Sequence, residues 1–424
     1  MSQKTFTQDP TLIIRGGRVI DPSEDIDGHL DIAITGEKIS GLGQDLAAGP
    51  STQIIDASDC LVIPGLIDLH AHVYPRIFPI GIDPDEVGVR SSVTTIVDCS
   101  ASPDTLTAFE HYVAQHAKTR VLSFLRISTL WWFDLLTFGL GGDFSRATLQ
   151  RLIDPAGVAR LAKDHRHLVK GIKVYAYGPD EGSTGVQALA LGKECAVMAG
   201  LPLVCHITHV GFQLAAHGLR TLTPEVLDLM ERGDVIIHAA SGLAGNLLQS
   251  DGSVLPQVRS AIERGVLFDL AHGLYMFSFA AAKRLLAEGI SPDIISTDIH
   301  VGNRHKVLFD LPTTMAKFLA LGLDLKEVIA RTTINPARAL GLEHTVGSLV
   351  QGKEADISIL KSVEGDWTFI DCHGELLPAK TTLVPAGTVR AGAYIETDPS
   401  TFLTQAGNPE AETNRPLPLW KLRR

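Results

Sequence analysis

Three scarcities limit what this sequence can encode. Cysteine is rare, because 424 residues hold only five, an odd number without Cys-x-x-Cys spacing, which argues against a disulfide framework and favours a reducing cytoplasm. No apolar run approaches the roughly 20 residues that span a bilayer, and residues 1–9 lack the apolar segment of a signal peptide. Basic residues are outnumbered 37 to 48, and a net charge of −11 without a basic stripe argues against nucleic-acid binding. We therefore expect a cytoplasmic protein that acts on a small molecule, with neither nucleic acid nor membrane as a partner.

The apolar segments that are present follow a repeating order of strand, loop and helix. Hydrophobic residues make up 45% of the chain, enough for a large core, and the repeat begins at residue 61. Eight such units in about 280 residues predict a (β/α)8 TIM barrel. A doubly wound sheet would need a Gly-rich loop after its first strand, where this sequence has His-Ala-His. The predicted strands lie at 61–69, 93–97, 121–125, 169–174, 203–205, 235–237, 266–270 and 294–297, with helices including 105–117, 187–199, 224–232 and 280–288.

Both ends of the chain have β character instead. Residues 11–60 are short apolar runs between Gly-containing turns, and strands are predicted again at 356–360, 367–371 and 381–395. We expect the two ends to form one small β-sandwich-like domain beside the barrel. The expected boundaries are 1–62 and 346–396 for this β domain, 63–345 for the barrel, and 397–424 for an irregular tail that could order against a neighbouring subunit of a homo-oligomer.

A pair of histidines follows the first predicted barrel strand. His70 and His72 are two residues apart in an alternating stretch, so on an extended strand both imidazoles point the same way. Two neutral imidazoles on one side can hold a metal ion. The pair alone is a weak signal, because either ring can also be a hydrogen-bonded histidine of the core or surface.

Further polar residues stand at the ends of later strands. A barrel places its chemistry at the carboxyl ends of its strands. Lys173 ends the fourth strand, His206 the fifth, His238 the sixth and Asp298 the eighth. Together with His70 and His72, they place four histidines, one lysine and one aspartate at five of the eight strand ends. Packing alone rarely generates such a set, so the sequence predicts a metal centre.

This order of residues resembles the amidohydrolase superfamily of metal-dependent hydrolases. Longer motifs are similar to its amidohydrolase/deacetylase branch, which is related to dihydroorotases and N-acyl-amino-acid deacylases. The resemblance covers roughly residues 11–396, and the proposed ligand set is its most specific part. The motifs are Pro64-Gly65-Leu66-Ile67-Asp68-Leu69-His70, Gly171-Ile172-Lys173-Val174, Asp269-Leu270-Ala271-His272-Gly273, Ser278-Phe279, Ile295-Ser296-Thr297-Asp298-Ile299-His300 and Thr333-Ile334-Asn335-Pro336-Ala337.

The resemblance implies two divalent metal ions, with zinc as the first choice and manganese, iron or cobalt as alternatives. His70, His72 and Asp298 would bind the more buried ion. His206 and His238 would bind the second ion, and a carbamylated Lys173 would bridge both. Asp298 would also accept the proton of a metal-bridging hydroxide as that hydroxide attacks the substrate, and pass it to the leaving group.

Several neighbouring residues leave alternatives open. Cys99, after the second predicted strand, competes with Lys173 as the bridging ligand, although its setting lacks the Gly-Asn-Cys-Gly motif of deacylases that use cysteine. His300 is two residues beyond Asp298 and could orient it. Tyr175 stands where close members of the branch carry Arg, so another arginine would have to bind a substrate carboxylate. The candidate substrate contacts are His272, Gly273, Tyr175, His209, Arg76 and Arg126.

The expected activity is hydrolysis of an amide or ester bond in a small acylated compound, as in a deacetylase. A cyclic amidase of the dihydroorotase or dihydropyrimidinase kind is the nearest alternative, since it could use the same ligands on a ring amide. An alternative that is not an enzyme is an oligomeric scaffold protein that retains the barrel without catalysis. Relatives of that kind typically lose metal ligands, whereas all six positions are occupied in this chain.

Overall fold

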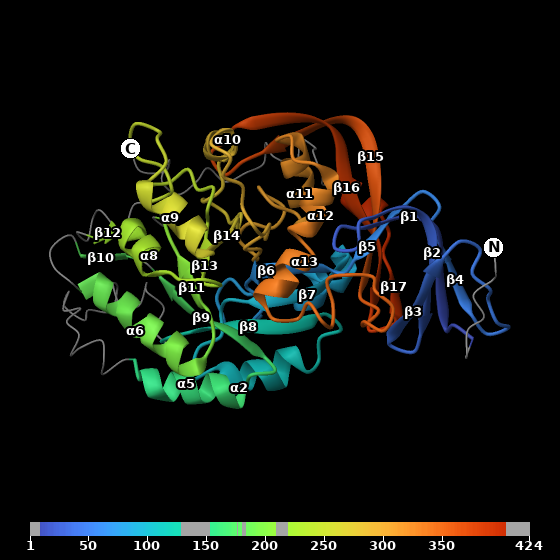
Figure 1. Cartoon of the computed structure of the whole chain (residues 1–424), viewed down its shortest axis with the longest axis horizontal. Helices are drawn as coiled ribbons and strands as arrows, with labels where there is room; N and C mark the ends of the chain where they lie inside the picture. Colours follow the sequence, from blue (N-terminus) through green and yellow to red (C-terminus); the bar gives the residue numbers. More distant parts are fainter. Residues whose placement is uncertain (1–8, 129–152, 176, 180–183, 209–218, 404–424) are drawn as a thin grey trace.

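The computed structural model describes residues 9–128, 153–175, 177–179, 184–208 and 219–403 (Figure 1). The candidate substrate contact His209 and residues 404–424 of the predicted tail lie outside these ranges. None of the helices in these ranges is both long and apolar enough to cross a bilayer. None of the five cysteines is in a disulfide.

Seven parallel strands form the wall of a barrel. Their order around the sheet is β14-β13-β11-β9-β8-β7-β6, which runs backward through the sequence as expected when each strand is followed by a crossover to its neighbour. All seven coincide with predicted strands. They are β6 (Leu66–Ala71), β7 (Val93–Asp98), β8 (Arg120–Arg126), β9 (Val169–Tyr175), β11 (Leu203–His206), β13 (Val235–Ile237) and β14 (Leu267–Asp269).

The eighth predicted strand closes the ring without forming a regular ladder. Parallel bridges join Ile294 to Asp269 of β14 and Ile299 to Ala71 of β6. Between them, the Asp298 amide donates to the His70 carbonyl at 2.7 Å. Asp298 has a φ of +52°, a left-handed conformation that interrupts an extended strand. The predicted (β/α)8 barrel is therefore confirmed. Its eighth strand consists of two isolated bridges, one on each side of Asp298.

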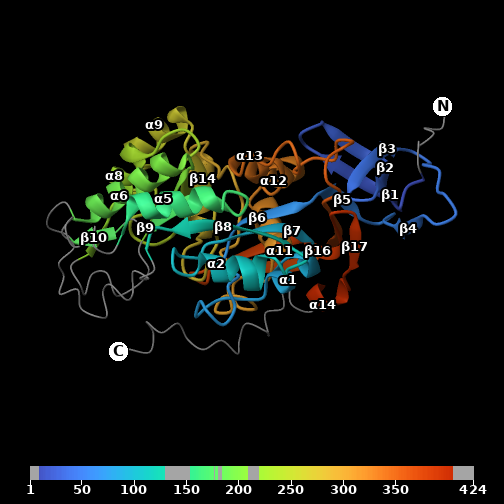
Figure 2. The ribbon, with the colours of Figure 1, turned by 90° about the horizontal axis from the view of Figure 1, so that it is seen from below.

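Helices cover the outside of the barrel (Figures 1 and 2). Proline occupies the first turn of α1, α5, α8, α9 and α11, where its missing N–H costs no hydrogen bond. The predicted helix at 105–117 is present as a short α2 that continues into a π-helical turn, η2. The helices are α1 (Pro84–Val87), η1 (Val89–Ser91), α2 (Leu106–Phe109), η2 (Glu110–Ala114), α5 (Pro155–Asp164), α6 (Thr184–Ala199), α8 (Thr223–Leu229), α9 (Pro256–Arg264), α10 (Phe279–Ala287), α11 (Leu311–Ala320), α12 (Leu325–Ala330), α13 (Ile334–Ala339) and α14 (Ser400–Leu403).

Strands from both chain ends form a second, mixed sheet beside the barrel (Figure 2). Its order is β17-β16-β15-β5-β1-β2-β3, with β4 paired to β1, so β5 against β15 is the seam that joins the two ends. A separate pair is formed by β10 (Tyr177–Pro179) and β12 (Leu219–Thr221). The strands of the mixed sheet are β1 (Leu12–Asp21), β2 (Ile26–Thr35), β3 (Lys38–Gly43), β4 (Gln53–Asp56), β5 (Leu61–Pro64), β15 (Ile357–Ile370), β16 (Leu376–Arg390) and β17 (Ala393–Glu396).

The apolar run at 61–69 is two strands rather than one. Its first half is β5, in the mixed sheet, and its second half is β6, the first barrel strand. Gly65 lies between them, where a Cβ atom would be 2.3 Å from the Thr94 hydroxyl oxygen. Only glycine allows the chain to pass this close to β7 as it moves from one sheet to the other.

A long hairpin connects the mixed sheet to the far side of the barrel. The sequence predicts separate strands at 356–360 and 367–371, but the structure joins them in β15, with a bulge between Glu364 and Trp367. The hairpin of β15 and β16 extends over the barrel to α10 (Figure 1). At its tip, the Asp371 carboxylate accepts from the Phe279 amide at 2.9 Å, at the start of α10.

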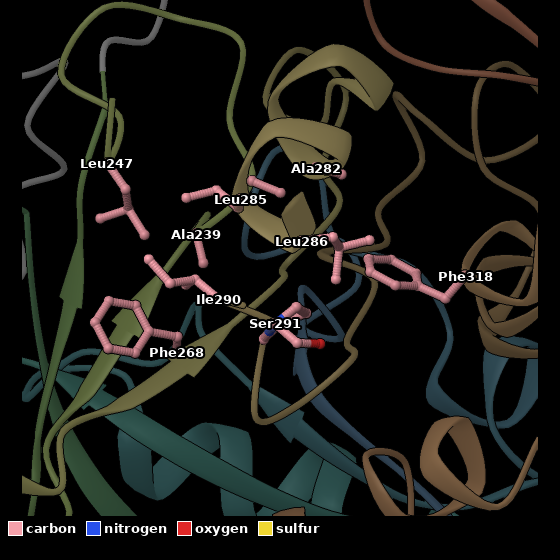
Figure 3. A pocket seen from close by; sticks show the side chains of 11 residues that line it. Ala239, Leu247, Phe268, Ala282, Leu285, Leu286, Ile290, Ser291 and Phe318 are labelled. Atoms are coloured by element: carbon pink, nitrogen blue, oxygen red, sulfur yellow. The ribbon is translucent and has the colours of Figure 1, made fainter. Parts of the chain in front are cut away.

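The packing of α10 on the barrel leaves a small apolar hole (Figure 3). Its volume is about 10 Å³, and its lining includes Ala239, Phe268, Leu285 and Phe318. A hole of this size holds at most one water molecule, and its walls offer that water little to bond. It is part of the core packing, and the chemistry of the molecule lies elsewhere.

Candidate metal centre

Three predicted ligands meet at the carboxyl end of the first and last barrel strands. The Nε2 atoms of His70 and His72 lie 3.4 and 3.1 Å from Oδ1 of Asp298. This oxygen is buried, yet it forms no hydrogen bond of good geometry within the described part of the chain. An orphaned carboxylate oxygen that faces two imidazole nitrogens is the arrangement that a shared cation would satisfy.

The other two predicted histidines form a second pair beside the first. Nε2 of His238 is 3.0 Å from Nδ1 of His206, and the ring of His238 lies 5.7 Å from that of His70. The other ring nitrogen of His238, Nδ1, is 2.6 Å from the Ala271 carbonyl. That contact requires a proton on Nδ1, so Nε2 keeps a lone pair for an ion.

Lys173 lies between the two histidine pairs. Its Nζ is 2.9 Å from Nε2 of His70 and 5.4 Å from the centre of the Tyr175 ring, which in turn is 5.0 Å from the ring of His206. The Cys99 thiol is hydrogen-bonded to the same amine. Gly171, two residues earlier, has no room for a side chain, because a Cβ there would be within 3.0 Å of the Phe124 and Val204 side chains.

The protonation states of these groups suit metal ligands. Burial lowers the pKa of His72 to about 3 and that of His238 to about 4. Burial also lowers the pKa values of His70 and His206 well below the usual range, so all four imidazoles are neutral at pH 7. Four neutral imidazoles beside one carboxylate and one amine fit zinc or a similar transition metal.

The Cys99 thiol is less suited to this role. It is buried at the carboxyl end of β7, and burial raises its pKa to about 12. A thiol with that pKa is protonated at neutral pH, whereas the thiolate is the form that binds metal.

Two of the predicted ligands have strained backbone. His238 has a φ of +70° and Asp298 a φ of +52°, and Ala271, which contacts His238, has a φ of +40°. Left-handed conformations are costly for residues other than glycine and persist where the surrounding structure enforces them. The strain turns both side chains away from the direction that an extended strand would give them, toward the other ligands.

Two buried carboxylates hold the segment that leads into Asp298, and neither was assigned a role from the sequence. Asp68 accepts from the Thr297 amide at 3.0 Å, and Asp269 accepts from the Ser296 hydroxyl at 2.7 Å. Both acceptors hold the segment that leads into Asp298. Both aspartates belong to motifs that the sequence analysis quoted. Because a buried carboxylate needs hydrogen-bond partners, an acidic residue on an otherwise apolar strand is the feature that could have identified them.

His300 lies near the centre and interacts electrostatically with Asp298. Its Nδ1 accepts from the Gly302 amide at 2.9 Å, and its ring is 6.1 Å from that of His72. The side chain that reaches Asp298 from this loop belongs to Asn303, whose amide donates to the Asp298 carbonyl at 2.7 Å. Asn303 had no motif that marked it in the sequence.

The candidate substrate contacts fall at different places. Tyr175 and Gly273 border the metal centre. Arg126 is buried behind His72, where it donates to the Ser100 carbonyl at 2.9 Å, and Ser100 contacts Nδ1 of His72. Arg76 is exposed in the loop after β6, with a φ of +67°.

His272 is held by protein groups on both sides. Its Nε2 lies 2.8 Å from Nζ of Lys317 and its Nδ1 lies 3.0 Å from the Gly273 carbonyl. Lys317, on α11, also donates to the Ile370 carbonyl of the hairpin at 2.8 Å. A substrate atom would have to displace one of these partners, so the geometry favours a supporting role for His272. Lys317 could not be predicted from the sequence, because no motif includes it and only the fold brings it close to His272.

Gly273→Ala is expected to impair the centre without unfolding the protein. A Cβ at this position would lie 2.9 Å from Oδ2 of Asp298, and the φ of +69° strains any other residue. We expect kcat to fall at least tenfold, with metal content reduced. The control is Gly289→Ala, which has a φ of +71° but open space around its Cβ. Equal losses in both variants would assign the effect to backbone strain rather than to the Asp298 contact.

Lys317→Met is expected to destabilise the fold by about 3 kcal/mol, because it removes the donor to a buried imidazole and two buried carbonyls. Urea denaturation monitored by circular dichroism measures the change. The matched control is Lys283→Met on the neighbouring helix, since Lys283 is 49% exposed and forms a surface ion pair with Glu375. That variant should stay within about 0.5 kcal/mol of wild type. Equal urea concentrations at the unfolding midpoint of both variants would contradict the role of Lys317 in holding His272.

Known proteins resemble this chain in sequence and in fold. The sequence pattern that defines the amidohydrolase family matches residues 277–391. A deacetylase of Agrobacterium fabrum is 31% identical over 373 residues, which are 86% of this chain and 88% of that protein. Among solved structures, an adenine deaminase has a TM-score of 0.77 at 28% identity and covers 92% of this chain and 100% of its own. A dihydroorotase has a TM-score of 0.75 at 26% identity and covers 91% of this chain and 99% of its own.

Proposed function

Because the chain belongs to the amidohydrolase superfamily, we propose that it is a binuclear metal-dependent hydrolase that removes an acyl group from a small substrate. The observation that carries the proposal is the convergence of four neutral imidazoles, Lys173 and Asp298 at one end of the barrel. The similarity to a deacetylase supports an acylated substrate over other amides. The bond broken would be an amide or an ester.

In this proposal six residues would hold two divalent ions. His70, His72 and Asp298 would hold one ion, His206 and His238 would hold the other, and a carbamylated Lys173 would supply carboxylate oxygens to the same centre. Zinc fits this donor set best. When bound, the ions supply Lewis acidity, which polarises the substrate carbonyl and lowers the pKa of water. Burial by itself disfavours the ammonium form of Lys173, but the neighbouring Cys99, Tyr175 and Asp298 raise its pKa above the usual value, so the amine would have to lose a proton before it reacts with CO2.

Asp298 is the proposed proton carrier. Its carboxylate borders both histidine pairs, and burial raises its pKa, so a proton taken up there is retained longer than on an exposed carboxylate. Oδ2 lies beside Gly273, where a Cβ atom would be 2.9 Å from it. Asp298 can therefore accept a proton from the attacking water and donate it to the leaving amine or alcohol.

A panel of substrates tests the proposal. N-acetyl amino acids and O-acetyl hydroxy acids should be hydrolysed, with acetate released, and dihydroorotate, hydantoins and adenine should be poor substrates. Ring opening without deacylation would overturn the deacetylase reading in favour of a cyclic amidase, for which the dihydroorotase similarity is the specific support. Ammonia release from adenine would favour a deaminase.

Metal analysis separates these enzymes from a non-catalytic scaffold. We expect about two ions per chain at the metal centre, whereas fewer than one ion per chain in total would favour the scaffold. The five cysteines without disulfides are consistent with a reducing compartment, and we propose that the enzyme acts in the cytoplasm as a homo-oligomer. Gel filtration with light scattering tests the oligomeric state.

A further inference from the structure

We propose that this chain holds a third metal ion at a separate site formed by Glu110, His165 and His167. Candidate ligand atoms of these three residues lie within 4.8 Å of one another. The site uses none of the residues of the metal centre described above. It does not depend on the reaction that the enzyme catalyses.

The site lies at the opposite end of the barrel from the metal centre. Glu110 begins η2, two elements after β7, and His165 and His167 lie in the loop between α5 and the start of β9. This loop enters β9 at its amino end, whereas Lys173 of the metal centre is near the carboxyl end of the same strand. An ion here would not reach a substrate at the catalytic end.

The backbone around the three side chains is well fixed. Phe109 and Val113, on either side of Glu110, are buried in the core. The His165 amide donates to the Leu161 carbonyl at 3.0 Å, and the His165 carbonyl accepts from Leu168 and Val169 at 2.8 Å each. The π-helical turn at Glu110 is a rare conformation that is frequent at functional sites. The three ligands are therefore presented by ordered segments.

The distances between the Glu110 carboxylate oxygens and the two imidazole nitrogens suit a bound cation, which would replace the protons of these two hydrogen bonds. Oε2 of Glu110 is 2.5 Å from Nδ1 of His165, and Oε1 is 2.6 Å from Nε2 of His167. Ligand atoms around tetrahedral zinc are about 3.4 Å apart, given metal–ligand bonds of about 2.1 Å. Each of the two Glu110–histidine distances would have to lengthen by less than 1 Å. Rotation of the exposed His167 ring can supply this change at one distance, and rotation of the Glu110 carboxylate at the other.

Burial and donor chemistry indicate which ion fits. The side chains of Glu110 and His165 are 16% and 20% exposed, whereas that of His167 is 64% exposed, so the site opens to solvent on one side. Two imidazoles and one carboxylate with room for water form a three-ligand set that suits zinc, nickel or cobalt and not calcium or magnesium. A bound ion would join η2 to the loop before β9, which makes its role structural.

Metal titration of the full-length protein tests the proposal. Protein with its metal centre loaded with zinc is titrated with further Zn²⁺ by isothermal titration calorimetry. Wild type should take up one additional equivalent, which the double variant H165A/H167A should lose. E110Q should weaken this binding at least tenfold. The matched control is H111A/H116A, which removes two exposed histidines near Glu110 and should keep the extra equivalent.

The outcomes are distinct from those of the proposed function. Uptake of no additional equivalent by wild type, or its persistence in H165A/H167A with native circular dichroism, would overturn the third site. Deacylase activity of H165A/H167A should equal that of wild type, because the site is remote from the metal centre. Failure of the substrate panel would leave the difference in zinc uptake between the two double variants unaffected.

Discussion

Asp298→Asn is expected to lower kcat by about 10²- to 10⁴-fold while the protein keeps most of its metal. The asparagine keeps one oxygen where Oδ1 now faces His70 and His72, so the first ion retains a ligand. It cannot accept a proton, because its amide is not basic near neutral pH. Steady-state kinetics with the best acetylated substrate, together with metal analysis by mass spectrometry, measures both quantities.

The matched control for this variant is Asp293→Asn. Asp293 lies five residues before Asp298, at the other end of the strand-eight segment, where its carboxylate accepts from the Phe268 amide at 2.8 Å. The same chemical change there should leave kcat within a few-fold of wild type. Near-normal turnover in Asp298→Asn would refute the proton-transfer role, and complete loss of metal would show that Asp298 acts mainly as a ligand.

Lys173→Ala is expected to have the second large effect, loss of at least half of the bound metal and nearly all activity. The variant removes the proposed bridge between the two ions and leaves a gap that is lined by His70, Cys99 and Tyr175. A short carboxylate can occupy that gap and supply the missing bridging oxygens. Acetate, formate or propionate at millimolar concentration should therefore restore part of the metal content and activity.

Cys99→Ala distinguishes the two candidate bridges. If Lys173 is the bridge, this variant should keep both ions and activity within about tenfold of wild type, because the thiol is protonated and only contacts the amine. Full metal occupancy in Lys173→Ala without added carboxylate, combined with metal loss in Cys99→Ala, would identify Cys99 as the bridging ligand instead.

The order of the barrel could be predicted because its signals are local. Each parallel strand is buried on both sides and appears in the sequence as a short apolar run, such as 121–125 or 235–237. The polar residue that ends such a run lies at the carboxyl end of the barrel by topology alone. The same reasoning could not detect the division of 61–69 at Gly65, because two strands of different sheets have the same apolar character there.

The support of the metal centre could not be predicted, because it depends on contacts between distant segments. Thr297 meets Asp68 across 229 positions of sequence, and Lys317 meets His272 across 45. The hairpin tip reaches α10 only because β15 and β16 are long enough to extend from the mixed sheet. No periodicity in the sequence encodes such distances.

The sequence by itself determined the order of the barrel strands and the six polar residues near their carboxyl ends, since strand alternation and apolar runs are properties of neighbouring residues. Only the tertiary structure determined how those side chains are oriented toward one another. His238 and Asp298 have left-handed backbone, and the buried Asp68 accepts a hydrogen bond from Thr297 beside Asp298, features that no local sequence pattern marks. The packing of η2 against the loop before β9 also brings Glu110 to His165 across 55 positions, a contact that no local sequence pattern predicts.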